Sequence, residues 1–401
     1  MAHALIVGAG IAGDTLAVFL GRAGWRVTVV EIAPALRSGG QTVDLRGDSR
    51  EVLAELGLLD AALDVLVPQR GLAWIDANER RLAAMPVEAF GGQGFVSSEE
   101  LLRTDLARIL HDAVGPTVEH RFGDTVERLT NTPDGVEALF RSGGTERFDL
   151  VIGADGAHST TRALAFGPEE RFRRPLGLAH AWFTLAEGPE TPPLDGWNLV
   201  HNSPGRLSVA ARPGHPGEQE IGLTFAASEL PPRAERMPLL ERAFAGVGWR
   251  TPEFLAAARI APDFALDTYD QVHMDAWSAG RIVLIGDAAW CASPLSGLGT
   301  ALGLRGAAEL AGALAAAGVR DDPRALPTAL VAFERAMRPR ATAAQKLLPG
   351  RVKMVAPKTA LGIRANAFVM RAVQSRVLLP LLTRVAQGSG HGTAEKASVP
   401  A

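Results

Sequence analysis

Three short segments rich in glycine and aspartate carry the residues of this 401-residue chain best suited to cofactor chemistry. The first is a Gly-x-Gly-x-x-Gly stretch, whose spacing lets the phosphates of a dinucleotide approach the backbone where a helix begins. One such stretch is a weak signal, whereas three related segments in one chain indicate a single bound dinucleotide. The positions concerned are Gly8, Gly10 and Gly13, then Asp155 and Gly156, then Asp287, Pro294, Gly297 and Gly299.

The first glycine stretch lies in a pattern typical of a β-α-β unit. Apolar residues 4–7 predict a strand, residues 11–23 a helix, and residues 26–30 a second strand. Glu31 follows that second strand directly. A carboxylate there accepts hydrogen bonds from a ribose 2′-hydroxyl, which favours NAD or FAD over NADP in this site.

The rest of the chain predicts an α/β protein in which a Rossmann-like domain is interrupted by an antiparallel sheet. Helical spacing is found in residues 51–66, 98–113 and 300–340, strand alternation in 118–153, and a buried strand in 281–285. We expect a cofactor-binding domain in two parts (1–174 and 276–340), a substrate-binding sheet domain (175–275), C-terminal helices (341–387) and a disordered tail (388–401).

Composition limits the class of protein. A net charge of −3 and a pI near 6.3 give no basic footprint for nucleic acid. The single cysteine, Cys291, excludes an internal disulfide or a cysteine-based metal cluster, and we expect no metal site. The N-terminus lacks the basic region of a signal peptide, and no uncharged run is long enough to span a membrane. These features predict a soluble globular protein of the reducing cytoplasm.

Charged residues are distributed unevenly along the chain. Residues 335–394 contain 11 basic residues and no acid, which fits either a solvated helix face or contact with a membrane surface or an acidic partner. Lysine is absent before Lys346. Arginine and backbone amides must therefore hold any phosphates bound by the first 345 residues.

Two longer segments around the later motifs resemble a known family. Residues 149–162 read DLVIGADGAHSTTR, residues 280–290 read GRIVLIGDAAW, and Leu102-Arg103 opens a helical pattern with leucines at 106 and 110. Over about residues 3–340 the chain resembles class A flavin monooxygenases of the para-hydroxybenzoate hydroxylase type, which include tetracycline-inactivating and polyketide-tailoring enzymes. The histidine that usually follows Asp-Ala-Ala in that family is Trp290 here.

The resemblance assigns roles to individual residues. It implies that Asp155 and Gly156 contact FAD, that Asp287 bonds the ribityl chain, and that the backbone from Pro294 to Gly299 runs along the flavin ring. It further implies that Arg103 lies by the FAD phosphates. Similarity to the tetracycline-modifying enzymes adds Asp44 as a flavin contact and Arg37 as a contact of the nicotinamide cofactor.

The reaction implied is an oxygenation. NADPH or NADH would reduce FAD, O₂ would add to give a C4a-(hydro)peroxyflavin, and one oxygen atom would enter a bulky aromatic or polyketide-like molecule. Three alternatives stay open on the same fold: a Baeyer–Villiger oxygenase, a flavin dehydrogenase or reductase, and a non-catalytic FAD-binding protein.

Candidate substrate contacts lie in the middle of the chain. We expect residues 175–275 to roof the substrate over the flavin. His201 is a candidate for deprotonating a phenol because histidine titrates near neutral pH, and Arg212 is a second catalytic candidate. The aromatic and polar candidates for the pocket are Trp182, Phe183, Trp197, Phe225 and Gln271.

Overall fold

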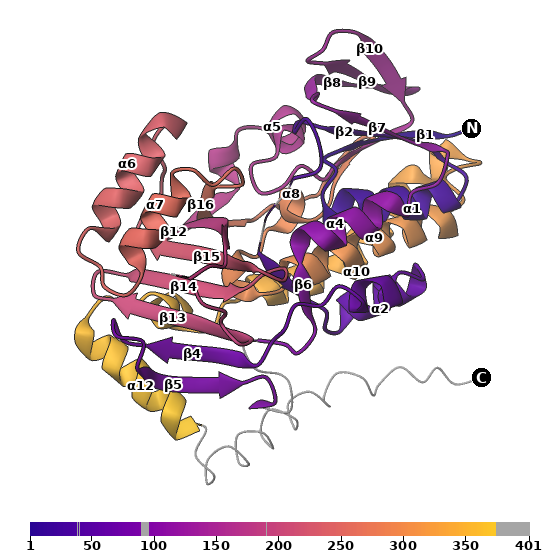
Figure 1. Cartoon of the computed structure of the whole chain (residues 1–401). Helices are drawn as coiled ribbons and strands as arrows, with labels where there is room; N and C mark the ends of the chain where they lie inside the picture. Colours follow the sequence, from indigo (N-terminus) through magenta and orange to yellow (C-terminus); the bar gives the residue numbers. More distant parts are fainter. Residues whose placement is uncertain (38, 40, 90–95, 190, 374–401) are drawn as a thin grey trace.

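A six-stranded, mostly parallel sheet forms the first part of the fold (Figure 1). The computed structural model describes residues 1–37, 39, 41–89, 96–189 and 191–373. Strand β1 pairs in parallel with β11 and β2, so the carboxyl ends of these strands meet at one edge. In spatial order the strands are β17 (Ser278–Ala279), β18 (Ile282–Leu284), β11 (Leu150–Gly153), β1 (His3–Val7), β2 (Arg26–Glu31) and β7 (Val118–Phe122), with β17 antiparallel to β18.

The two faces of this sheet belong to separate cores. Ala4 and Ile6 pack with helices, whereas Leu5 and Val7 pack with a small antiparallel sheet, because successive side chains of a strand point to opposite faces. The helices are α1 (Ile11–Arg22), α9 (Gly299–Ala316) and α10 (Leu326–Gln345), and the small sheet comprises β8 (Val126–Thr132), β9 (Gly135–Phe140) and β10 (Thr145–Phe148).

Two of the predicted helices differ from the observed elements. Residues 51–66 form two short helices rather than one, because Gly57 between them adopts φ +66°. The segment 98–113 begins as a strand that pairs with β3, so its helix starts only at Arg103. The elements are β3 (Thr42–Asp44), α2 (Asp48–Glu55), α3 (Leu59–Leu63), β6 (Glu100–Leu102) and α4 (Arg103–Asp112).

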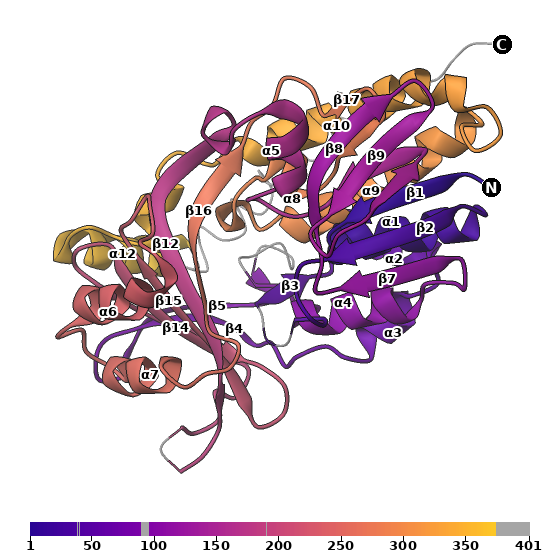
Figure 2. The ribbon, with the colours of Figure 1, turned by 90° about the horizontal axis from the view of Figure 1, so that it is seen from above.

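A seven-stranded sheet forms the second part of the fold and lies beside the first (Figure 2). It includes two strands from residues 71–86, which we expected in the cofactor-binding domain. The boundary at residue 175 therefore does not describe this sheet, because β13 pairs in parallel with β4 from the first half of the chain. In spatial order the strands are β16 (Ala265–Val272), β12 (Arg173–Ala186), β15 (Glu218–Phe225), β14 (Leu207–Pro213), β13 (Trp197–Ser203), β4 (Gly71–Ile75) and β5 (Arg81–Pro86).

The faces of the seven-stranded sheet have different neighbours. Helices α6 (Arg233–Phe244) and α7 (Thr251–Ala258) cover the face directed away from the parallel sheet and share an apolar core with it (Figure 2). Helix α12 (Ala360–Val373) covers the other face at the end of the sheet that holds β5, β4 and β13, where Met370 packs with Met85. The remainder of that second face, which we call the roof face, is directed toward the parallel sheet.

The last described helices are α10, α11 (Arg351–Val355) and α12. The end of the predicted C-terminal helices and the whole predicted tail at 388–401 lie outside the described residues. Among the residues that the structure describes, no helix has the length and apolarity needed to cross a membrane.

Candidate cofactor and substrate site

The three glycine motifs meet at the carboxyl ends of β1, β11 and β18. Gly8 has φ +108°, and a Cβ there would lie 2.6 Å from the carbonyl oxygen of Ala154, so the first two motifs are in backbone contact. A Cβ on Gly286 would lie 3.1 Å from the Cβ of Ala12, which brings the third motif against helix α1. Parallel pairing of β1, β11 and β18 thus brings motifs that are far apart in the sequence next to one another.

The amino end of helix α1 is free of side-chain capping. Gly10 is its N-cap residue, and no side chain among the described residues caps the helix with a hydrogen bond. A Cβ on Gly13 would lie only 2.0 Å from the Gly8 carbonyl oxygen, so glycine is required for this tight turn. An uncapped helix start combined with close backbone access is the geometry that binds a pyrophosphate.

Glu31, the last residue of strand β2, lies beside this turn, as its position in the sequence predicts. Its carboxylate accepts hydrogen bonds from the backbone amides of Ala9, at 3.0 Å, and Ala33, at 2.9 Å. These bonds hold the glycine loop against the end of β2. A carboxylate with two oxygens retains lone pairs for a ribose hydroxyl in addition.

Arg103 lies beside the glycine loop, with its Nη2 3.8 Å from the position of a Cβ on Gly10, and its charge interacts with that of Asp287. Both are exposed, although Gly286 and Ala288 on either side of Asp287 are buried. The enclosing protein lowers the pKa of the Arg103 guanidinium and raises the pKa of the Asp287 carboxyl, while their mutual attraction opposes both shifts. The charge of Arg37 also lowers the pKa of Arg103, so two arginines share this region.

Asp155 has a different environment from the one its predicted role suggests. Its carboxylate accepts hydrogen bonds from the Ser159 hydroxyl at 2.5 Å and from the Thr161 amide at 2.8 Å, which fixes the start of helix α5 (Thr160–Phe166). Burial raises its pKa. The fully buried Arg162, not singled out in the sequence, donates to the carbonyls of Ala157 and Ala288 and so ties the second motif to the third.

The third motif presents exposed backbone beside Asp287. Pro294, Gly297 and Gly299 are exposed after the short helix α8 (Asp287–Trp290), and a Cβ on Gly299 would lie 4.0 Å from an Asp287 carboxylate oxygen. Asp44, on strand β3, is paired with Arg46 through one oxygen. Its other oxygen, Oδ1, is buried and has no partner among the described residues, which is costly unless a ligand supplies a donor.

The roof face carries a polar and aromatic surface opposite these motifs. Arg212 donates to Glu100 of strand β6 at 2.6 Å, and Gln271 donates to the carbonyl of Ala292 in the third motif at 3.3 Å. Trp182 lies on the same face, since its register partner Gly222 opposes Ala210, next to Arg212. Two of the predicted pocket residues, Trp182 and Gln271, and the catalytic candidate Arg212 therefore lie on the roof face.

Sequence reasoning missed three further roof residues, His180, Glu220 and Tyr269. The rings of His180 and Tyr269 lie 5.5 Å apart, and burial lowers the pKa of His180 to about 4 and raises that of Tyr269 to about 12. Burial also raises the pKa of Glu220 to about 7. One signal in the sequence could have found His180. Alternate residues of a strand share a face, so His180 lies on the same face as the candidate Trp182, with Ala181 on the other.

The other four candidates lie on the opposite, helix-covered side. Phe183 and Phe225 are fully or almost fully buried in the core formed with α6 and α7. The His201 ring lies 6.4 Å from that of Trp249, its Nδ1 is 3.3 Å from the Ile75 carbonyl oxygen, and burial lowers its pKa. Trp197 stacks under Arg81. We correct the expectation for these residues: strand alternation turns them away from the cofactor side, and no role in catalysis follows for His201.

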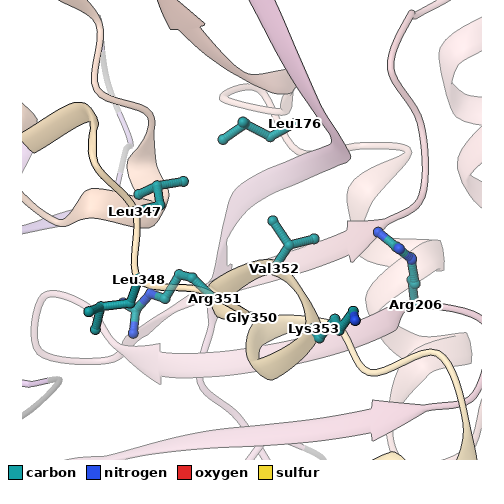
Figure 3. A pocket seen from close by; sticks show the side chains of 8 residues that line it. All are labelled: Leu176, Arg206, Leu347, Leu348, Gly350, Arg351, Val352 and Lys353. Atoms are coloured by element: carbon teal, nitrogen blue, oxygen red, sulfur yellow. The ribbon is translucent and has the colours of Figure 1, made fainter.

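A separate recess of about 310 Å³ lies beside the short C-terminal helix α11 (Figure 3). Figure 3 shows Leu176, Leu347 and Val352 around it, with Arg206 and Lys353 at its side. None of the three glycine motifs lines this recess. We therefore do not place the substrate there.

The residues present fit FAD. The uncapped helix α1 and Arg103 would hold the pyrophosphate, Glu31 the adenosine ribose, Asp287 the ribityl chain, and the exposed backbone of the third motif the flavin ring. The buried orphan oxygen of Asp44 gives the cofactor a further bond to make. Fold and site together define a FAD-binding protein of the Rossmann-like α/β class.

Comparisons with known proteins agree with this class. The family model described as "FAD binding domain" matches residues 1–345, and the chain belongs to that family. It is 40% identical over 324 residues to an uncharacterized protein of Mycobacterium tuberculosis, covering 79% of this chain and 86% of the relative. It is 32% identical over 358 residues to the FAD-dependent monooxygenase asL4 of Sarocladium schorii, covering 84% and 83%. The crystal structure of tetracycline destructase Tet(51) superposes with a TM-score of 0.77 at 27% identity, covering 100% of this chain and 99% of that chain.

Proposed function

We propose that this enzyme uses NADPH or NADH to reduce bound FAD and inserts one atom of O₂ into a bulky aromatic or polyketide-like molecule. The observation that carries the proposal is the orientation of the roof face. Two of its side chains contact the third motif: Gln271 donates to the carbonyl of Ala292, and Tyr269 shares an apolar cluster with Leu295. A cytoplasmic location, where reduced nicotinamides are available, is part of the proposal.

When bound and reduced, FAD supplies the activated oxygen, and the chain must bind, orient and shield the substrate. Trp182 and Tyr269 offer aromatic surface for a ring system. Arg212 offers a guanidinium whose Nε is buried without a partner among the described residues. A phenolate or enolate oxygen is the substrate group that such a donor attracts best.

Proton handling at the roof falls to Glu220. One carboxylate oxygen accepts a bond from Thr184 at 3.0 Å, while the other is buried and unpartnered among the described residues. With its pKa raised to about 7, the carboxyl exchanges a proton near neutral pH. The depressed pKa of His180 keeps that imidazole neutral, so it orients the substrate without adding charge.

Arg37 is proposed to contact the nicotinamide dinucleotide while it reduces the flavin. It is exposed, and its charge acts on Arg103 beside the glycine loop. An exposed arginine at the margin of the cofactor recess suits a partner that binds and leaves in each turnover.

Isotope incorporation tests the proposal. Purified FAD-loaded enzyme is reduced anaerobically with NADPH or NADH, then mixed with ¹⁸O₂ and a panel of phenolic polycycles. We expect one ¹⁸O atom in a hydroxylated product. An ester product would identify the Baeyer–Villiger alternative, and oxidised product without label would identify a dehydrogenase. Failure of both nicotinamides to reduce the flavin with substrate present would contradict the proposal.

A variant set tests the role of Arg212. Arg212→Met should raise KM for a phenolate substrate by about 10- to 100-fold, the range expected for losing a hydrogen bond to a charged group. Arg212→Lys keeps the charge and should recover part of this loss. Arg233→Met is the matched control, because Arg233 is exposed on α6, beyond the opposite face of the sheet. Equal KM values in all variants would remove Arg212 from the site.

A further inference from the structure

A compact group of two histidines and one aspartate lies outside the cofactor site. Asp14 belongs to helix α1, His111 to the last turn of α4, and His120 to the edge strand β7. One possible ligand atom of each residue lies within 4.8 Å of the others. Asp14 is distant in sequence from the two histidines, and our expectation of no metal site rested on the single cysteine.

The polar atoms of this group are incompletely bonded. Asp14 is fully buried, and its Oδ1 lies 2.9 Å from His120 Nε2. Its Oδ2 and the Nδ1 of His111 are both buried and have no partner among the described residues. A buried carboxylate oxygen and a buried imidazole nitrogen left unbonded each carry a desolvation penalty. Two such atoms in one group point to a ligand that bonds to both.

We infer that Asp14, His111 and His120 bind a divalent first-row transition metal, for which Zn²⁺ is the natural probe. Two imidazole nitrogens and one carboxylate oxygen are the donor set of three-ligand zinc sites, with water in the fourth position. Ligand atoms about 2.0–2.2 Å from a metal are separated from one another by about 3.3 Å in tetrahedral geometry. Since the ligand atoms already lie within 4.8 Å of one another, small side-chain movements bring the group to this arrangement.

Packing around the group favours a fixed site. The His120 ring stacks on Phe122 at a centroid distance of 5.8 Å, and the His111 ring meets His120 edge-on at 4.3 Å. The three ligands come from three elements, so a bound metal would join α1, α4 and β7. Asp14 lies in the first turn of α1, directly after Gly13 of the glycine loop, and the metal would therefore stabilise the end of the helix that holds the cofactor.

The competing explanation is a simple hydrogen bond between Asp14 and His120. His111 separates the two explanations, because its Nδ1 bonds to no described residue and contributes nothing to a simple pair. His111→Gln should therefore leave folding nearly unchanged while removing a metal ligand. This variant keeps the test valid even if Asp14→Asn fails to fold.

The experiment measures Zn²⁺ binding to the FAD-loaded, EDTA-treated and dialysed enzyme by calorimetry. We expect one Zn²⁺ per chain and a weakening of at least about tenfold in His111→Gln, since even outer-shell changes cost about 10- to 100-fold. Zinc should also raise the unfolding temperature of the wild type but not of this variant. Because the readout is metal affinity, it is independent of oxygenase activity.

His158→Gln is the matched control. His158 contacts Glu169 and Asp267 at the surface, so its substitution tests nonspecific zinc binding by a surface histidine–carboxylate group. We expect this variant to retain wild-type affinity. Absence of stoichiometric binding, unchanged affinity in His111→Gln, or loss of affinity in His158→Gln would each overturn the inference.

Discussion

Single residues on the roof face have pKa values that connect the site to the stability of the protein. Glu220 is buried, and its pKa is raised from about 4.5 to about 7. A carboxyl whose pKa is higher in the folded state stabilises that state most below its unfolded pKa, and this contribution is lost as pH rises through the folded value. Ionisation of Glu220 therefore opposes folding progressively between pH 4.5 and 7.

The substitution Glu220→Gln tests this relation. It should flatten the decline in unfolding free energy across that pH range and leave the variant more stable than the wild type at pH 8, by up to about 3 kcal/mol. Urea denaturation at pH 5 and pH 8 measures the effect. Parallel pH profiles for the two proteins would show that Glu220 does not titrate near neutrality in the folded state.

Asp287 offers a residue-scale test of cofactor binding. Asp287→Asn keeps the size of the side chain but removes the charge that faces Arg103. We expect FAD affinity to fall by about tenfold or more, because a charged hydrogen bond is worth about 1.5–3 kcal/mol. Titration of the FAD-free variants by flavin fluorescence measures this, with Asp48→Asn as control because Asp48 bonds to Arg305 and Arg340 instead.

At the scale of elements, helix α9 and Trp290 form a complementary pair. Trp290 occupies the position where related flavin monooxygenases usually have histidine, and it is 1% exposed. Gly306 of α9 faces its ring, and a Cβ there would lie 2.6 Å from Trp290 Cζ2. The Trp290 ring therefore leaves no room for a side chain at position 306 of the helix. Tryptophan in place of the family's usual histidine is thus accommodated by packing against glycine.

Gly306→Ala should destabilise the protein by about 1–3 kcal/mol, because overpacking outweighs the gain in helix propensity. Gly312→Ala, in the same helix with open space around its Cα, should instead stabilise it by up to about 1 kcal/mol. In the Trp290→His background the cost of Gly306→Ala should disappear. Thermal and urea denaturation measure whether each variant is more or less stable than the wild type. If Gly306→Ala still destabilises the protein in the Trp290→His background, the proposed pairing of Trp290 with Gly306 is wrong.

Hydrophobic periodicity and glycine spacing predicted the strands and helix around the glycine motifs. They did not predict which strands form the second sheet or which residues lie on its roof face. The β-α-β unit was predictable because Gly8, Gly13 and Glu31 act within one short segment. Strands β4 and β5 were not, because their place in the second sheet depends on pairing with β13, more than 100 residues away. The side of the sheet that His201 faces depends on strand register, which one sequence does not reveal.

At the scale of the whole molecule, the chain passes repeatedly between the two sheets. Strands β4 and β5 leave the cofactor-binding part and β6 returns to it, and β12 to β16 repeat the excursion. Contacts such as Arg212 to Glu100 join the two parts. We therefore expect the FAD-loaded protein to unfold as one cooperative unit.

Three probes test this expectation. Tryptophans occur in both parts, for example Trp25 and Trp277 in the first core and Trp182 and Trp249 in or beside the second sheet. Tryptophan fluorescence, far-ultraviolet circular dichroism and release of flavin should follow one transition on heating. Flavin release well below the loss of secondary structure would show that the two parts separate first.

The placement of lysine has a practical consequence. Lys346, Lys353 and Lys358 are all exposed near the C-terminal helices, and the N-terminal Met1 is exposed as well. Reagents that acylate amines will therefore react at the two ends of the chain and find no target among the residues proposed to hold FAD. The enzyme should tolerate attachment to an amine-reactive resin or electrode in a restricted set of orientations, with its cofactor recess chemically intact.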